Sequence, residues 1–175
     1  PGAHVGSGLE QGIERIGEAH AELLGAQEAG DEPGADVTLC LENTAGGGST
    51  IGRTFEELRD TREAIVRHAR RRFTKAQAKR IAERVGFCFD TCHALAAGYD
   101  IAAFPDGDAG GGAKRSVGEG AELADAMLDE FDRCCGLARL HVVHVNDSMA
   151  PRGSRRDRHE HIGKGHVGKG AFAAV

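Results

Sequence analysis

The sequence lacks any run of the roughly 18 consecutive apolar residues that a membrane-spanning helix needs. It also lacks a cationic segment followed by an apolar one at its start, so nothing in it indicates secretion. We therefore expect a cytoplasmic protein that makes no membrane contact. Hydrophobic residues make up 40% and charged residues 28% of the 175 residues, as in a single globular domain with a hydrophobic core.

The sequence also lacks the cysteine pattern of a disulfide framework. Its five cysteines are odd in number, Cys134 and Cys135 are adjacent, and Cys40 lies in an apolar run. Cys88 and Cys92 are four residues apart and no second pair follows, which argues against a zinc finger. We expect reduced and mostly buried thiols, as in cytosolic proteins.

An excess of positive charge is absent as well. The formal net charge of −5 argues against a general polyanion binder. Residues 151–175, however, hold six basic and two acidic residues, a local charge of +4, which leaves −9 for the preceding 150 residues. This segment is either a solvated loop or a surface that meets phosphate. The glycines at 46–48 are not followed by Gly-Lys-Ser/Thr, so they do not form a phosphate-binding P-loop.

The apolar periodicity predicts helices that alternate with short strands. Capping boxes at 7–10 and 54–57 predict two helix starts. We expect a turn at 31–34 and a glycine-rich loop at 105–118. The predicted helices cover about 9–25 (or to 30), 54–70, 75–84, 122–134 and the chain from 171; the predicted strands are 37–41, 85–89 and 140–145. This order indicates a parallel sheet, either doubly wound or part of a (β/α)8 barrel, because three strands cannot close a barrel.

Polar side chains that can bind metals follow all three predicted strands. Glu42 ends the first strand, Asp90 and His93 follow the second, and His144 and Asp147 follow the third. The carboxyl ends of parallel strands are where α/β sheets and barrels place their active sites. A single residue of this kind is explained by a helix cap or a buried hydrogen bond, but three successive strand ends favour a site.

The ligand types at these positions are imidazole and carboxylate without paired thiolates. That combination suits a catalytic zinc or manganese cluster better than a structural zinc. Asp157 and His159 are two residues apart, so in an extended segment both side chains point the same way and can reach one metal. The alternative is a set of hydrogen-bonded Asp–His pairs without metal. We expect His141 to be structural, and we expect the remaining histidines to be surface or loop residues: His20, His68, His161 and His166.

Four blocks of the sequence resemble, in order, the signature blocks of endonuclease IV (AP endonuclease family 2, deoxyribonuclease IV). These blocks are Leu41–Gly46, Phe89–Asp100, His144–Asp147 and Gly153–His159. The resemblance implies a xylose-isomerase-like TIM barrel. Because such barrels are longer, we expect residues 1–175 to be one incomplete (β/α)8 domain that lacks parts at both ends.

The resemblance also implies a ligand set for three zinc ions. Glu42 would bridge two of them and act as the catalytic residue, while Asp90 and His144 would bind the second ion. The third ion would be held by His93, Asp157 and His159. Pro1–His4 resembles the end of a motif whose first residue, a ligand histidine, would precede Pro1; His4 itself is not expected to bind metal. Six of nine expected ligands are thus present, and only the third site has all its protein ligands.

The implied activity is zinc-dependent hydrolysis of the phosphodiester 5′ to abasic sites in double-stranded DNA during base excision repair. It would leave a 3′-hydroxyl and a 5′-deoxyribose phosphate, and we expect a monomer. Arg155 and Arg158 either contact DNA phosphate or pair with Asp157 and Glu160. The alternative is a sugar isomerase or epimerase with a divalent metal, although a third metal site favours the nuclease. We expect residues 1–175 in isolation to be inactive.

Overall fold

The computed structural model describes residues 2–4, 6–29, 36–102 and 114–174. The turn expected at 31–34 and most of the glycine-rich loop expected at 105–118 lie outside the described residues. The elements are α1 (Leu9–Ala29), β1 (Leu39–Glu42), α2 (Phe55–Arg72), α3 (Lys75–Glu83), β2 (Val85–Asp90), α4 (Thr91–Ala97), α5 (Val117–Cys135), the 3-10 turn η1 (Leu137–Arg139), β3 (Leu140–His144), β4 (Asp147–Ser148), β5 (His159–Glu160) and α6 (Ala171–Ala174). None of the described helices combines the length and apolarity needed to span a bilayer.

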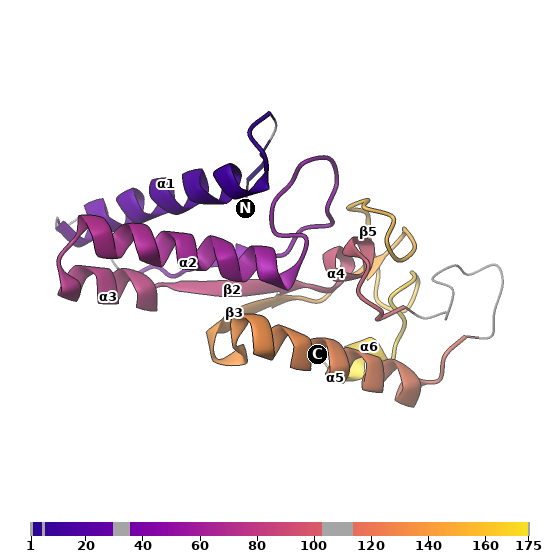
Figure 1. Ribbon diagram of the computed structural model, residues 1–175. Helices are drawn as coiled ribbons and strands as arrows, with labels where there is room; N and C mark the ends of the chain where they lie inside the picture. Colours follow the sequence, from indigo (N-terminus) through magenta and orange to yellow (C-terminus); the bar gives the residue numbers. More distant parts are fainter. Residues whose placement is uncertain (1, 5, 30–35, 103–113, 175) are drawn as a thin grey trace.

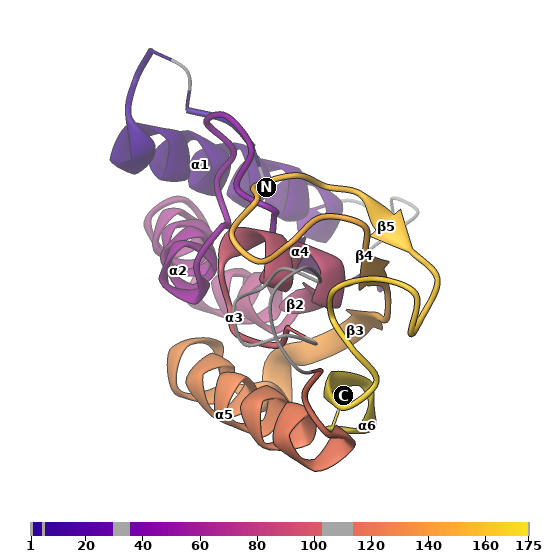
Figure 2. The same ribbon diagram turned by 90° about the vertical axis from the view of Figure 1, so that its right-hand side faces the viewer.

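The three longer strands form a parallel sheet in the order β1-β2-β3. Sequential neighbours with helical connections are typical of a barrel, whereas a doubly wound sheet reverses its strand order at a switch point. Helices α1, α2, α3 and α5 lie in an arc along one side of the strands (Figure 2). The described part of the chain is therefore a partial TIM barrel with open sheet edges, as the sequence predicts.

The two faces of the sheet have different tasks because side chains alternate along each strand. Leu41, Phe87 and Phe89 are buried in the core that the helices cover. Phe131 of α5 packs edge-on against Phe87, with ring centroids 5.8 Å apart. The opposite face carries Glu42 at the end of β1 together with the polar ends of β2 and β3. The strands thus use one face for stability and leave the other for chemistry.

The third strand is less buried than its neighbour. Val142 and Val143 of β3 are 39% and 37% exposed, whereas every residue of β2 is buried. The physical reason is its position: β3 is the edge of the described sheet and packs against β2 alone. The strand itself is confirmed at Leu140–His144, one residue shorter than predicted.

Helix starts also differ from the prediction in detail. The Ser7 hydroxyl donates to the carbonyl of His4 at 3.4 Å instead of capping the first helix. Thr54 does cap α2 by accepting from the amide of Glu57. A capping box also requires the Glu57 side chain to accept from the amide of Thr54. This part of the prediction is wrong, because the Glu57 carboxylate accepts from the amides of residues 52 and 53 instead.

Helix α5 begins at Val117, five residues earlier than predicted, because Ser116 and Glu119 form a capping box there. Some short elements were not expected. Helix α4 (Thr91–Ala97) follows directly on β2 and ends at Gly98, whose φ of 123° is accessible to glycine. At the same end of the molecule, β4 and β5 form a short antiparallel ribbon within a segment predicted to be loop (Figure 1).

Candidate metal centre

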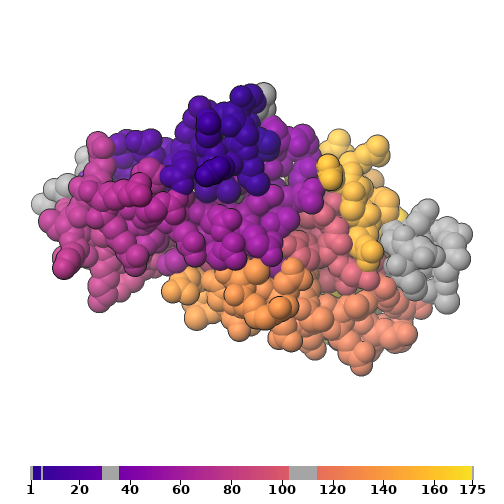
Figure 3. Space-filling view, in the orientation of Figure 1, coloured from indigo at the N-terminus to yellow at the C-terminus, as the bar shows by residue number. Residues whose placement is uncertain are grey.

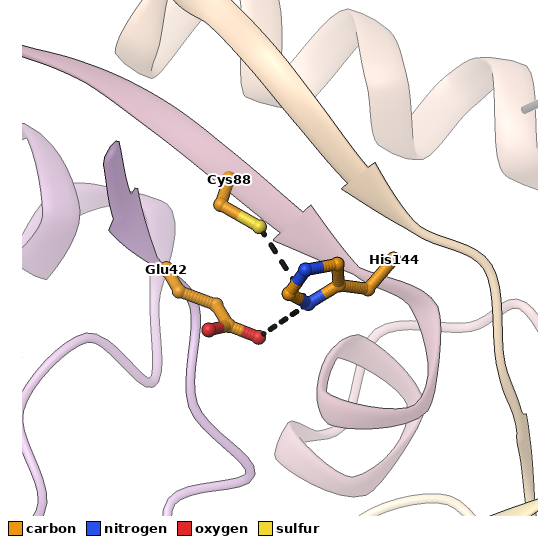
Figure 4. Close-up of side chains that lie close together, drawn as sticks. All are labelled: Glu42, Cys88 and His144. Carbon is orange, nitrogen blue, oxygen red and sulfur yellow. Dashed lines mark hydrogen bonds and ion pairs between the residues drawn. The ribbon is translucent and has the colours of Figure 1, made fainter. Parts of the chain in front are cut away.

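The ends of β1, β2 and β3 bring the first three predicted residues together. The register pairs Asp90 with His144 across β2 and β3, and Glu42 pairs with Cys88 across β1 and β2. The Nδ1 atom of His144 lies 3.0 Å from Oε1 of Glu42 (Figure 4) and 3.7 Å from Oδ2 of Asp90. Strand register alone therefore creates a cluster of two carboxylates and one imidazole.

Helix α4 adds His93 to this cluster. Asp90 is the N-cap of α4, and its Oδ1 accepts from the amide of His93 at 2.9 Å. The spacing of three residues places both side chains on the same side of the first turn. His93 Nδ1 lies 2.9 Å from the carbonyl of Asn43, which can only accept, so Nδ1 carries the proton. The free electron pair is then on Nε2, which lies 3.3 Å from Oδ2 of Asp157.

The ribbon of β4 and β5 brings in the last two residues. β5 begins at His159, which pairs with Ser148 of β4. His159 Nε2 lies 3.1 Å from Oδ1 of Asp157 and 3.8 Å from Oδ2 of Asp90. The rings of His93 and His159 are 5.4 Å apart between centroids. The structure therefore gathers the six side chains that the resemblance implies as metal ligands, but not Asp147.

These side chains form overlapping groups whose ligand atoms lie within 4.8 Å of one another. One group is His93, Asp157 and His159; a second is Glu42 and His144 with Cys88. A further group of Glu42, Asp90 and His93 competes for His93, whose Nδ1 already donates to the Asn43 carbonyl. We therefore regard His93, Asp157 and His159 as the group with the most complete ligand geometry.

Two asparagines that the sequence analysis did not assign hold Asp90 in place. Asn43 is buried and makes two hydrogen bonds to the backbone of Asp90, at 3.0 and 2.7 Å. Asn146 donates its amide to Oδ2 of Asp90 at 2.9 Å. Asn43 directly follows Glu42, and Asn146 lies two residues after His144. This proximity to candidate ligands is the sequence signal that could have identified the two asparagines. Their role is to orient a wholly buried carboxylate.

Cys88 was expected to be a buried thiol, and it is buried next to the cluster. Its Sγ lies 3.7 Å from Nδ1 of His144. Burial, reinforced by the charges of Glu42 and Asp90, raises the pKa of the Cys88 thiol to about 12. The position of Cys88 two residues before Asp90, on the same face of β2, explains why it faces the polar cluster.

Asp147 follows β3 but points away from the cluster. Its side chain is fully buried and accepts from the backbone amides of Ser148, Gly163 and Val167, each at 2.8 Å. An added Cβ on Gly165 would lie 2.5 Å from Oδ1 of Asp147, so the loop wraps closely around the carboxylate. Asp147 therefore orders the loop at 163–167. Unlike the other strand-end residues, it is not available to a metal.

The two arginines considered for DNA contact lie beside the cluster on an exposed loop. Arg158 donates to the backbone carbonyl of Asp157 at 2.9 Å. Within the described ranges, no carboxylate lies within ion-pairing distance of Arg155 or Arg158, so the expected alternative of pairing with Asp157 and Glu160 is wrong. Arg155 adopts a φ of 54°, in the left-handed region.

The other histidines lie outside the cluster. His68 pairs with Glu14, and His20 contacts the carbonyl of Ile16. His166 lies in a loop, as expected, and its Nδ1 atom is buried without a hydrogen-bond partner. An added Cβ on Gly86 would touch the ring of His141, which fits the structural role expected for that residue.

A separate cavity of about 690 Å³ lies at the opposite end of the sheet, where β2 and β3 begin. Cations dominate its lining: Arg62, Arg70, Lys75, Lys79 and Arg139. Such a lining repels metal ions, and the cavity is remote from the carboxylates at the strand ends. The candidate site is therefore the polar cluster.

Fold and site together define an α/β barrel protein with a polyhistidine–carboxylate centre at the carboxyl edge of its strands. The model of the family described as "Xylose isomerase-like TIM barrel" matches residues 1–175. The chain belongs to this family.

Relatives within the family confirm the resemblance to endonuclease IV. The chain is 40% identical to "Probable endonuclease 4" of Geobacillus sp. (strain WCH70) and 37% identical to that of Bacillus subtilis (strain 168). Both matches cover all of this chain but 44% and 46% of the relatives' lengths. Endonuclease IV from Thermus thermophilus is similar in structure, with a TM-score of 0.52 and 36% identity over 78% of this chain and 37% of that one. The chain thus spans less than half the length of these relatives.

Proposed function

We propose that this chain is part of a zinc-dependent endonuclease that hydrolyses the phosphodiester 5′ to abasic sites in DNA, as a step of base excision repair. The observation that carries the proposal is the convergence of three carboxylates and three imidazoles at one edge of the sheet. Homology to proteins named endonuclease 4 supports this activity over a sugar isomerase. The five free cysteines support a reducing, cytoplasmic location.

The donor set fits zinc. Nitrogen and carboxylate oxygen without paired thiolates are the ligands of catalytic zinc sites. His93, Asp157 and His159 would hold one ion, and Glu42, Asp90 and His144 would contribute to the others. Bound zinc supplies Lewis acidity, which activates water and neutralises charge on phosphate oxygens.

The residues around the ligands prepare them for this task. The Asn43 carbonyl fixes the tautomer of His93 and leaves Nε2 free for a metal. Asn146 and the amide of His93 hold the two oxygens of Asp90, and Glu42 contacts both His93 and His144 through its Oε1, at 3.5 and 3.0 Å. We propose that Glu42 is the catalytic residue that links the metal positions.

Arg155 and Arg158 are proposed to contact the phosphates of the substrate. Both are exposed and lie next to Asp157 and His159, and no described carboxylate neutralises them. They belong to the segment 151–175, whose charge is positive in an otherwise acidic chain. Cations beside the metal group would position DNA without reading its sequence.

A nicking assay tests the proposal. The protein, expressed from its complete reading frame, is incubated with a duplex that carries one abasic site and an end label. We expect a single cut 5′ to the site, with a 3′-hydroxyl that a polymerase extends. A chelator should abolish cutting and added zinc should restore it. Glu42→Gln should lower kcat/KM by at least about 100-fold, because it removes a charge on which the metal cluster depends.

Glu63→Gln is the matched control, because Glu63 is an exposed residue of α2 at a distance from the cluster. It should cut like the unaltered protein. An intact duplex after incubation with the zinc-loaded protein, together with metal-dependent interconversion of an aldose and a ketose, would instead establish the sugar isomerase.

A further inference from the structure

We infer that Asp100 is a positioning residue for the metal centre and acts through its ion pair with Arg152. The inference rests on the proposed metal centre and adds a residue that contacts none of its ligands. Asp100 follows helix α4, and Arg152 lies in the loop that leads to Asp157. The pair therefore joins the segment that carries Asp90 and His93 to the segment that supplies Asp157 and His159.

The need for such an anchor follows from the exposure of the loop ligands. The side chains of Asp157 and His159 are 61% and 45% exposed, whereas that of His93 is 14% exposed. Asp157 and His159 thus have little packing of their own to hold them. A metal group requires its ligands within about half an ångström of their positions, so the backbone of this loop must be fixed by other contacts.

Two backbone hydrogen bonds fix one side of the loop to α4. The amide of Gly153 donates to the carbonyl of Leu95, and that of Arg155 donates to the carbonyl of Ala96, both at 3.0 Å. These carbonyls are at the carboxyl end of α4, where helix carbonyls lack partners within the helix. The loop is therefore docked on the same short helix that carries His93.

The ion pair fixes the loop on its other side. Arg152 Nη1 lies 2.7 Å from Oδ2 of Asp100. Asp100 is itself held by Arg115, whose two terminal nitrogens donate to the two carboxylate oxygens at 2.8 and 3.1 Å. Arg115 also donates to the carbonyl of Ala102. One carboxylate between two guanidinium groups is a rigid anchor, because the bidentate pair sets the orientation of the oxygen that Arg152 meets.

The charges at this anchor agree with its geometry. Burial raises the pKa of Asp100, but hydrogen bonds and charges from Arg115 and Arg152 outweigh burial and lower it overall. The carboxylate is thus fully ionised at neutral pH. The side chains of Asp100 and Arg152 are 34% and 36% exposed. Pairs this exposed contribute little to global stability, so we expect the effect of Asp100 to appear in the position of the loop.

Zinc binding by the full-length, metal-free protein tests the inference. The protein is titrated with Zn²⁺ against a chromophoric chelator, which gives the number of ions bound and their affinities. We expect Arg152→Gln and Asp100→Asn each to weaken one class of zinc sites by about 10- to 100-fold, as other outer-shell substitutions do. The double variant should bind no more weakly than Asp100→Asn alone, because both changes break the same pair. Arg152→Lys should retain part of the affinity.

Arg156→Gln is the control, because Arg156 lies in the same loop and is exposed. It should bind zinc like the unaltered protein. Thermal unfolding of metal-free Arg152→Gln should shift by less than about 4 °C, which separates a positioning effect from unfolding. Unchanged affinity in Arg152→Gln, an equal loss in Arg156→Gln, or additive losses in the double variant would overturn the inference. If the unaltered protein bound no zinc, the proposed function itself would fail instead.

Discussion

At the scale of single residues, chemistry decides which polar side chains serve the site and which serve the fold. Asp90 and Asp147 are both wholly buried carboxylates near strand ends. The carboxylate of Asp90 accepts two hydrogen bonds and lies within 4.0 Å of ring nitrogens of His93, His144 and His159. Asp147 accepts three backbone amides and has no imidazole among its hydrogen-bond partners. The same residue type thus has opposite roles a short distance apart.

The structural role of Asp147 makes a prediction about stability. Asp147→Ala would leave three backbone amides without a partner, two of them in the loop at 163–167. We expect the free energy of unfolding to fall by at least about 2 kcal/mol, since unsatisfied buried donors cost about 1–3 kcal/mol each. Urea unfolding followed by circular dichroism measures the change. Asp36→Ala, at an exposed position, is the control, and an equal change in both variants would contradict the prediction.

The six candidate ligands could be proposed from the sequence because strand ends and motif order identify them. Asn43 and Asn146 are signalled only by lying next to or near Glu42 and His144, because their hydrogen bonds to Asp90 depend on strand register that sequence spacing does not specify. The same holds for the contact of Cys88 with His144. Asp100 and Arg152 are 52 residues apart and meet only because the loop folds back over α4. Residues that bind are therefore easier to predict than the residues that hold them.

At the scale of elements, long periodic helices and apolar strands were predictable and short ones were not. Helix α2 and strand β2 match their predicted positions within about two residues. Helix α4 has seven residues and the strands β4 and β5 have two each, which is too short for a periodic pattern. These short elements nevertheless carry His93 and His159. Their conformation is fixed by tertiary contacts with the sheet rather than by local sequence preference.

The basic stretch from Arg67 to Arg84 also finds its explanation between elements. Arg72 pairs with Glu22 at 3.0 Å, and Arg84 pairs with Glu28 at 3.0 Å, while Arg67 and Arg80 also pair with glutamates of α1. Four arginines of the stretch therefore neutralise glutamates of the acidic helix α1. The space-filling view shows α1 (indigo) lying directly on α2 (purple) (Figure 3).

Close packing of α1 on α2 makes a prediction at the scale of elements. An added Cβ on Gly17 would lie 2.6 Å from Cβ and 2.9 Å from the carbonyl carbon of Ala64. Alanine normally favours a helix by up to about 1 kcal/mol over glycine. Here we expect Gly17→Ala to destabilise the protein by about 1–2 kcal/mol, because α1 must move away from the backbone of α2.

Gly118→Ala is the matched control, since an added Cβ at this position of α5 meets nothing within 4 Å. Thermal unfolding of both variants measures the difference. Gly118→Ala should be neutral or slightly stabilising. A Gly17→Ala protein as stable as the Gly118→Ala protein would show that the two helices are not packed as closely as described.

At the scale of the whole molecule, the sheet is unfinished at the edge where the site opens. Val142, Val143 and Val145 are 37–42% exposed along and just beyond β3, although apolar strands of parallel sheets are normally covered on both faces. His144, on the same strand, has a side chain that is 47% exposed. One side of the candidate metal centre therefore faces solvent where a complete barrel would supply further strands.

This open edge predicts how residues 1–175 behave when they are expressed alone. We expect the isolated chain to bind a hydrophobic dye strongly, because apolar surface on β3 is uncovered, and to leave an abasic duplex uncut. The protein made from its complete reading frame should bind less dye per residue and cut the duplex, because additional strands would cover β3 and add ligands to the centre. Dye fluorescence and the nicking assay compare the two proteins under the same zinc concentration. Turnover by residues 1–175 at the rate of the longer protein would mean that the described partial barrel already holds a complete active site, and the need for further strands would be disproved.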